Sequence, residues 1–328
     1  MDLIRAVQHS HLPVLSWRPA LSSTSSPLHR FPKLCDVGKS CIPFRTSTSV
    51  SSRSHVRIRT LPVHAQIAAP VRIVQQAFLQ FPPSWTSSLI ANATIFTIGL
   101  PILQTGLTAS GMASAYLLGT STWRAFGASG FLVVAAYFVL GTAVTKVKIK
   151  QKEKEGIAEK RSGKRGPASV WGSGLAGMFC ALAAIVGLGG VKHFQLWQLG
   201  FVASFATKLS DTVSSEIGKA FGRTTYLVTT LKPVQRGTEG AISLEGTGAG
   251  LVASILLSLF AYRIHQVTIQ GAAICIVASQ LANLFESYAG ATLQDTDGLK
   301  WLNNDVINVL NISFGAALAI LFQKINLL

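Results

Sequence analysis

The sequence predicts an all-α membrane protein, a polytopic bundle of about six to eight transmembrane helices. Apolar residues make up 49% of the 328 residues and charged residues only 13%, whereas soluble domains carry roughly 25% charge. Apolar segments of the length that crosses a bilayer, about 20 residues, recur along the chain after residue 85. A soluble domain with an unusually large core is the less favoured alternative.

The first 65 residues differ from the rest. They are rich in Ser, Thr and Arg, hold nine Lys and Arg against Asp2 and Asp36, and have no long apolar run. This composition is typical of an organelle transit peptide, and its Ser and Thr content favours a plastid. A disordered cytosolic tail would look similar. We expect a transit peptide at 1–65 and a membrane-embedded domain at 66–328, in a chloroplast membrane.

Eight apolar segments follow in order. They lie at residues 86–107, 110–126, 128–146, 169–190, 194–209, 247–265, 267–290 and 305–323. Some are short or contain a polar residue such as Arg124. Small residues are frequent in them and allow close helix packing in lipid. The stretch GSGLAG at 172–177 matches a dinucleotide-binding glycine pattern, but it lies inside a candidate span, so we interpret its glycines as packing positions.

The net charge of +16 does not indicate a nucleic-acid partner. Much of it lies in the first 65 residues and in the segment 145–166, TKVKIKQKEKEGIAEKRSGKRG. A basic loop between apolar spans typically fixes topology through the positive-inside bias. The four cysteines have no metal or redox spacing, and only His193 and His265 follow residue 65, so a His-based catalytic centre is not expected.

A charged stretch, KLSDTVSSEIGKAFG at 208–222, continues directly from an apolar span. As a helix it places its polar residues on one face: Lys208, Asp211, Thr212, Ser215, Glu216, Lys219 and Gly222. A solvated stripe on an interfacial helix is one interpretation. Because ionisable groups at membrane depth are costly unless they face a cavity and have a function, we favour a functional site.

A glycine-rich loop is expected at 231–250, LKPVQRGTEGAISLEGTGAG. Glycines let backbone amides approach an anion, and basic side chains add donors. The candidate phosphate-binding residues are Lys232, Arg236, Gly237, Thr238, Gly240, Ser243, Gly246, Thr247 and Gly250. The spacing does not fit the P-loop, and a flexible connector is equally compatible with it.

Two further polar clusters lie in later spans. In SQLANLFESYAGATLQ the residues Gln280, Asn283, Glu286, Ser287 and Gly290 recur at helical spacing. A buried carboxylate such as Glu286 needs a cation partner, although a structural polar zipper would give the same pattern.

In WLNNDVINVLNISFG, Asn304, Asn308 and Asn311 share a helical face beside Asp305. Asp305 would also be favourable near a helix N-terminus. Asn and Asp oxygens are hard ligands that suit Mg²⁺.

Together the clusters predict a site for phosphoryl transfer, which requires mainly positioning and charge neutralisation. Asp211, Glu216 and Lys208 are the candidate catalytic residues. The expected Mg²⁺ ligands are Asp211, Glu216, Glu286 and Asp305, and the phosphates are expected on Lys208, Lys219, Lys232 and Arg236. Ser215, Asn283, Ser287, Asn304 and Asn308 complete the polar site. A membrane location suits a lipid phosphate as acceptor.

The motifs SDTVSSEIGKAFG, RGTEGAISLEGTGAG, FESYAGATLQ and NNDVINVLN resemble, in this order, the integral membrane family that includes the plastid phytyl-phosphate kinase of vitamin E synthesis. The resemblance covers roughly residues 85–328. It implies transfer of a phosphoryl group from a nucleoside triphosphate, CTP, to phytyl phosphate, in phytol salvage and tocopherol synthesis. Residues 66–328 would then be a membrane-embedded kinase domain.

Two other functions use similar residues. Intramembrane carboxylates and Asn-rich helices also build ion paths, as in a transporter or ion exchanger. A nucleotidyl transferase acting on a lipid phosphate would need nearly the same groups. The sequence leaves open the nucleotide preference, the acceptor chain length, the plastid membrane and the oligomeric state.

Overall fold

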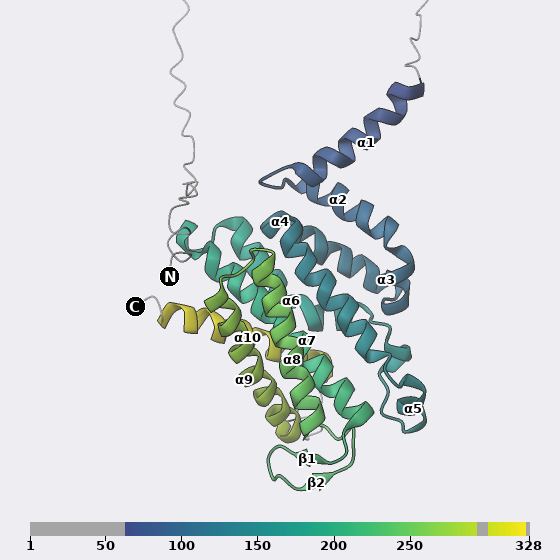
Figure 1. Ribbon diagram of the computed structural model, residues 1–328, viewed down its shortest axis with the longest axis vertical. Helices are drawn as coiled ribbons and strands as arrows, with labels where there is room; N and C mark the ends of the chain where they lie inside the picture. Colours follow the sequence, from purple (N-terminus) through teal and green to yellow (C-terminus); the bar gives the residue numbers. More distant parts are fainter. Residues whose placement is uncertain (1–62, 294–300, 326–328) are drawn as a thin grey trace, which may run out of the picture. The chain divides into compact units, whose positions relative to one another are not determined.

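The computed structural model describes residues 63–293 and 301–325. The predicted transit peptide at 1–65 lies almost entirely outside these residues. The described part is helical apart from a small sheet (Figure 1), which confirms the all-α bundle. Its helices are α1 (Val63–Leu79), α2 (Trp85–Ile98), α3 (Leu100–Gly106), α4 (Ala109–Thr145), α5 (Ile149–Lys154), α6 (Pro167–Val186), α7 (Phe194–Phe221), α8 (Leu244–Arg263), α9 (Ile269–Leu293) and α10 (Asn304–Ile325).

Helix α4 is broken into two arms at Gly127. This glycine has φ +70° and ψ −164°, a backbone conformation open to glycine but strained for other residues. A Cβ added at Gly111 or at Gly141 would lie within 3 Å of an atom of Arg165. Since both positions approach the same residue, the two arms fold back beside each other, and they match the spans expected at 110–126 and 128–146.

Five described helices are long and apolar enough to cross a membrane: α4, α6, α8, α9 and α10. The pair α2 and α3, bent by 79° at Gly99, makes up to six. This count treats α4 as one helix, although its two arms were predicted as separate spans. It agrees with the predicted six to eight spans.

Helix α7 is the central helix of the bundle and packs against α4, α6, α8, α9 and α10. Phe201, Phe205 and Leu209 are completely buried in it. Its charged second half is also enclosed, with Lys208, Asp211 and Glu216 all buried. The face therefore points into the bundle at these three residues, whereas Ser215 is exposed and Lys219 half-buried further along it, so the face as a whole is not a solvated stripe.

The expected glycine-rich loop is mostly regular structure. Strands β1 (Thr225–Leu227), β2 (Pro233–Val234) and β3 (Ala241–Ser243) form an antiparallel sheet of order β2-β1-β3. The strand β3 leads directly into α8. A Cβ added at Gly250 would lie 1.9 Å from Ser214 Oγ, and one at Gly246 would lie 2.5 Å from the Ser214 carbonyl oxygen. These two glycines are therefore helix-packing positions between α7 and α8.

The glycines of GSGLAG lie inside α6, as expected. A Cβ added at Gly174 would meet Leu118 at 2.7 Å, and one at Gly177 would meet Phe205 at 2.5 Å. The segment brings α6 against α4 and α7, so it has no part in dinucleotide binding.

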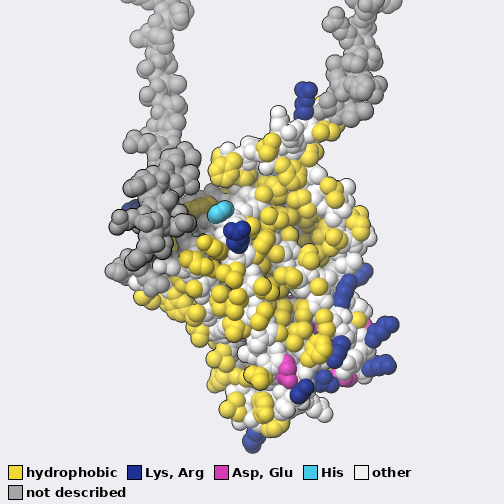
Figure 2. Space-filling model, in the orientation of Figure 1, with side chains coloured by type: hydrophobic (Ala, Val, Ile, Leu, Met, Phe, Trp, Pro, Cys, Tyr) yellow, Lys and Arg dark blue, Asp and Glu magenta, His cyan; other side chains and the backbone are white. Residues whose placement is uncertain are grey.

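Charge is concentrated at one end of the bundle. On the face shown in Figure 2, hydrophobic side chains cover most of the helical surface, whereas most of the Lys, Arg, Asp and Glu side chains gather at the end that holds the sheet and α5. Helices α7 and α9 end here, and α6, α8 and α10 begin here. We infer that this end lies outside the hydrocarbon and faces water.

Candidate functional site

A cavity of about 830 Å³ lies at the charged end of the bundle. Its volume falls within the roughly 300–1,000 Å³ of small-molecule sites. All four polar clusters expected from the sequence line it. The predicted site residues in its wall are Lys208, Asp211, Ser215, Glu216, Lys219, Gly237, Thr238, Gly240, Ser243, Gly246, Thr247, Asn283, Glu286, Ser287, Asn304, Asp305 and Asn308. Lys232, Arg236 and Gly250 are outside the wall.

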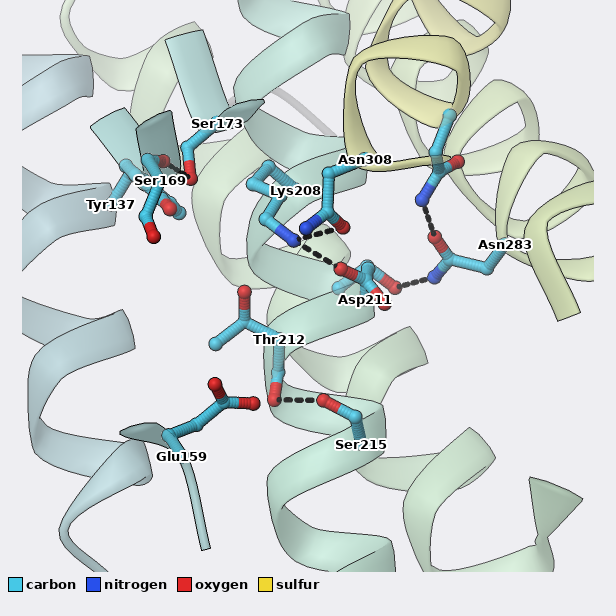
Figure 3. Close-up of polar contacts among 12 residues, drawn as sticks. Tyr137, Glu159, Ser169, Ser173, Lys208, Asp211, Thr212, Ser215, Asn283 and Asn308 are labelled. Carbon is cyan, nitrogen blue, oxygen red and sulfur yellow. Dashed lines mark hydrogen bonds and ion pairs between the residues drawn. The ribbon is translucent and has the colours of Figure 1, made fainter. Parts of the chain in front are cut away.

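Lys208 is the centre of the polar contacts (Figure 3). Its Nζ donates to Asp211 Oδ2 at 2.5 Å and to Asn308 Oδ1 at 2.7 Å. The side chain is 8% exposed. It therefore ties the functional face of α7 to the asparagine face of α10.

The remaining amides join three helices. Asn283 on α9 donates to Ser210 Oγ at 2.7 Å, and Asn311 on α10 donates to Asn283 Oδ1 at 3.4 Å. Gln280 also donates to Ser210 Oγ, at 3.1 Å. These contacts form the structural polar zipper considered for this cluster. Asn283 and Gln280 nevertheless also line the cavity.

The four candidate carboxylates occupy different surroundings. Glu286 lies in the same cavity wall as Asp211, close enough for the two carboxyl groups to interact electrostatically. Glu216 instead forms a buried ion pair with Lys152. Asp305 stands in the first turn of α10, as expected for a helix N-terminus, with Oδ1 facing Gly172 of α6. Among the described residues no three His, Cys, Asp or Glu side chains form a metal-binding group.

Glu216 keeps one free oxygen. Its Oε1 is buried and has no hydrogen-bond partner among the described residues. A buried carboxylate oxygen without a partner is costly. Glu216 can therefore still receive a ligand from the cavity while Lys152 holds its other oxygen.

Three helices direct their N-termini at the cavity. Its wall includes Ser169 and Ser173 of α6, Thr247 of α8, and Asn304 of α10. Helix N-termini present free N–H groups and a partial positive charge, which favour phosphate. Together with Lys208 they provide a setting for several phosphate groups.

The basic segment 145–166, which the sequence indicated only as a topology signal, forms one side of the cavity. Arg161, Lys164 and Arg165 line it. Besides the Lys152–Glu216 pair, Lys148 Nζ donates to the Ala220 carbonyl at 3.1 Å. The glutamates between its lysines were the sequence feature that could have indicated ion pairs between this segment and other parts of the fold.

Two of the cations expected to bind phosphate are used to hold this segment. Arg236 donates to both carboxylate oxygens of Glu155, at 3.0 and 3.1 Å. Lys219 lies 3.4 Å from Glu159. Lys232 is exposed and lies immediately before β2. Of the four predicted phosphate-binding cations, only Lys208 and Lys219 reach the cavity, and the basic segment provides the others.

Comparison with known proteins places this architecture in a family. The family model described as integral membrane protein DUF92 matches residues 92–316. The chain belongs to this family. The resemblance expected from its motifs is thereby confirmed, as is the multi-pass membrane character.

Three relatives each match more than half of this chain. Protein VTE6, chloroplastic, of Arabidopsis thaliana is 59% identical over 77% of this chain and 75% of its own length. An uncharacterized membrane protein of Synechocystis sp. is 47% identical over 74% of this chain and 92% of its own. One of Methanocaldococcus jannaschii is 31% identical over 58% and 74%. No solved structure matches the chain significantly. With its similarity to a chloroplastic relative, the chain is a multi-pass protein of a chloroplast membrane.

Proposed function

We propose that this protein is a phytyl-phosphate kinase, which transfers the γ-phosphoryl group of a nucleoside triphosphate, CTP, to phytyl monophosphate. The product, phytyl diphosphate, would serve phytol salvage and tocopherol synthesis. The observation that supports this most is the cavity at the water-facing end, where the buried Lys208, several more exposed cations, three helix N-termini and the carboxylates Asp211 and Glu286 share one space. The similarity to protein VTE6 of Arabidopsis thaliana supports the plastid setting, and residues 1–65 remain its predicted transit peptide.

The proposed reaction needs no covalent intermediate. A phosphate oxygen of the acceptor attacks the γ-phosphorus, the bond from that phosphorus to the β,γ-bridging oxygen breaks, and the nucleoside diphosphate leaves with this oxygen. Lys208 and Lys219 would offset the charge of the phosphates, together with Arg161 and Lys164 from the basic segment. Such positioning and charge neutralisation account for most of the catalysis of phosphoryl transfer.

The residues present fit a magnesium ion. Mg²⁺ is usually bound through one or two carboxylates together with substrate phosphates and water. The adjacent carboxyl groups of Asp211 and Glu286 meet this requirement without a third protein ligand, and the free oxygen of Glu216 is a further candidate. When bound, the ion would neutralise charge on the transferred phosphoryl group.

The test is a matrix of donors and acceptors with the purified protein and Mg²⁺. CTP, ATP, UTP and GTP are each combined with phytyl, geranylgeranyl and farnesyl phosphates, and lipid diphosphate is measured. We expect phytyl diphosphate and a nucleoside diphosphate in equal amounts, with CTP as the best donor. No lipid diphosphate with any pair would refute the proposal. Pyrophosphate release would identify a nucleotidyl transferase, and substrate flux in liposomes without triphosphate consumption a transporter.

A further inference from the structure

A second, apolar cavity adjoins the polar one. It has a volume of about 160 Å³ and lies between α2, α3, the two arms of α4, and α6. Its wall is almost wholly hydrocarbon, including Phe96, Leu103 and Leu118. Tyr137 and Arg165 line both cavities. A molecule with a polar head and an apolar body could therefore occupy both at once.

The apolar cavity is accessible from the lipid-facing surface. Ile102 of α3 and Val139 of α4 belong to its wall, and they are 58% and 49% exposed. These side chains sit on helices that are apolar enough to lie in the bilayer. The bend at Gly99, which turns α3 away from α2, forms part of the same wall. A hydrocarbon chain could enter here from the side, without passing through water.

The boundary between the cavities is suited to a phosphate. Arg165 Nη1 donates to the Tyr137 hydroxyl at 2.8 Å. Its guanidinium also lies 5.0 Å from the centre of the Tyr137 ring. A guanidinium has five N–H donors and binds phosphate in a bidentate manner, so Arg165 retains donors for an anion on the polar side.

We propose that the apolar cavity binds the first isoprene unit of the lipid acceptor, with Arg165 and Tyr137 contacting its monophosphate at the boundary. This inference rests on the proposed function and names the acceptor subsite. An apolar cavity of about 150 Å³ takes up a molecule the size of benzene, so the space holds only the carbons nearest the phosphate. The rest of the chain would extend through the open side into the bilayer.

The test uses a photoreactive isoprenoid monophosphate with a diazirine on its first isoprene unit, bound to the full protein in lipid nanodiscs. Cross-linked peptides are identified by mass spectrometry. We expect them at cavity-lining positions of α2, α3, α4 or α6, or at Phe205 of α7, and we expect phytyl phosphate to compete with the probe, whereas phytol and phosphatidic acid compete poorly. Cross-links confined to residues outside the cavity wall, or equal competition by phosphatidic acid, would overturn the inference.

A matched pair of variants sharpens this test. Ala115 lines the cavity, and Ala115→Phe should fill it and reduce cross-linking at least tenfold. Ala113 lies on the exposed side of the same helix, so Ala113→Phe adds the same bulk outside the cavity and should leave cross-linking unchanged. The smaller Ala115→Val should give an intermediate loss if Ala115→Phe does not fold. Unchanged labelling in a folded Ala115→Phe protein would contradict the proposed subsite.

Cross-linking needs binding but no turnover, so the two proposals can fail separately. If wild-type protein forms lipid diphosphate but the probe labels only residues outside the cavity wall, only the acceptor subsite is wrong. If the probe labels the apolar cavity but no donor yields lipid diphosphate, the kinase proposal is wrong and a lipid-phosphate site remains.

Discussion

Asp211 lies next to both a positively charged and an acidic side chain at the site. Lys208 lies 2.5 Å from one of its oxygens, and Glu286 lies beside it. Asp211→Asn keeps the volume but removes the charge, so we expect kcat to fall about 10²- to 10³-fold, as when one electrostatic group of an active site is lost. Steady-state rates over a Mg²⁺ titration check this.

Gln195→Ala is the control for this variant, because Gln195 is exposed at the opposite end of α7. Its rate and Mg²⁺ dependence should equal those of the wild-type protein. An unchanged kcat in Asp211→Asn would remove Asp211 from the catalytic site.

Variants of the buried Lys152–Glu216 pair can distinguish a structural role of Glu216 from a metal-binding role. Both side chains are at most 2% exposed. Lys152→Met leaves a buried carboxylate without its partner and should cost about 3–5 kcal/mol, whereas replacing both with apolar residues is often neutral or stabilising. Thermal unfolding of Lys152→Met and of the double variant Lys152→Met/Glu216→Leu measures this difference.

Activity of the double variant then decides between the two roles. If Glu216 only anchors α5, a stable double variant keeps most of the wild-type kcat. If the free oxygen of Glu216 receives metal or substrate, the double variant is stable but inactive. A double variant as unstable as Lys152→Met would show that the ion pair is not what makes the single change costly.

At the scale of elements, the turn before β3 depends on Gly240. This glycine has φ +72°, and a Cβ there would lie 2.4 Å from the Ala291 Cβ of α9. Gly240→Ala should therefore push the turn away from the cavity, at a cost of about 1–3 kcal/mol for the backbone strain, and reduce nucleotide affinity. Thermal unfolding and nucleotide titration detect both effects.

Gly248 offers the matched control. A Cβ there meets nothing within 4 Å, and the residue lies in α8, so Gly248→Ala should stabilise the protein by up to about 1 kcal/mol through helix propensity. Equal effects of the two substitutions would contradict the contact between the turn and α9.

The sequence predicted the positions of the helices and their polar faces better than it predicted which residues pair across the fold. Hydropathy located the two arms of α4 on either side of Gly127, and helical spacing placed Lys208 and Asp211 on one face. Neither method pairs residues far apart in the chain. Glu216 meets Lys152 across 64 positions, so both the ion pair and the role of the basic segment were missed. Gly250 was misinterpreted because a glycine at a helix crossing and one in a phosphate loop look alike.

At the scale of the whole molecule, the basic segment combines two roles. It is the kind of loop that holds topology by the positive-inside bias, and it also lines the cavity with Arg161 and Lys164. The two roles require the same location, because the loop that stays on the nucleotide side is the one able to bind phosphate. The helix directions agree with phosphate binding at this end, because α6, α8 and α10 begin there.

This arrangement predicts which residues a membrane-impermeant thiol reagent reaches from each side. Cys180 and Cys275 are buried, so they can remain once Cys35 and Cys41 are replaced by Ser. In intact oriented vesicles, Cys introduced at Lys154 and at Lys232 should react from one side. Cys introduced at Lys192 and at Gln270, in or next to the connections at the opposite end of α7 and α9, should react only from the other.

A nucleoside triphosphate should slow the labelling of the Lys154→Cys protein, because Arg161 and Lys164 of the same segment line the cavity. It should not slow labelling of the Lys192→Cys protein, because residue 192 lies at the far end of the bundle. Reaction of the Lys154→Cys and Lys232→Cys proteins from opposite faces would separate the basic segment from the sheet. The cavity could not then exist in the membrane, since the Arg236–Glu155 pair that joins them requires both on one side.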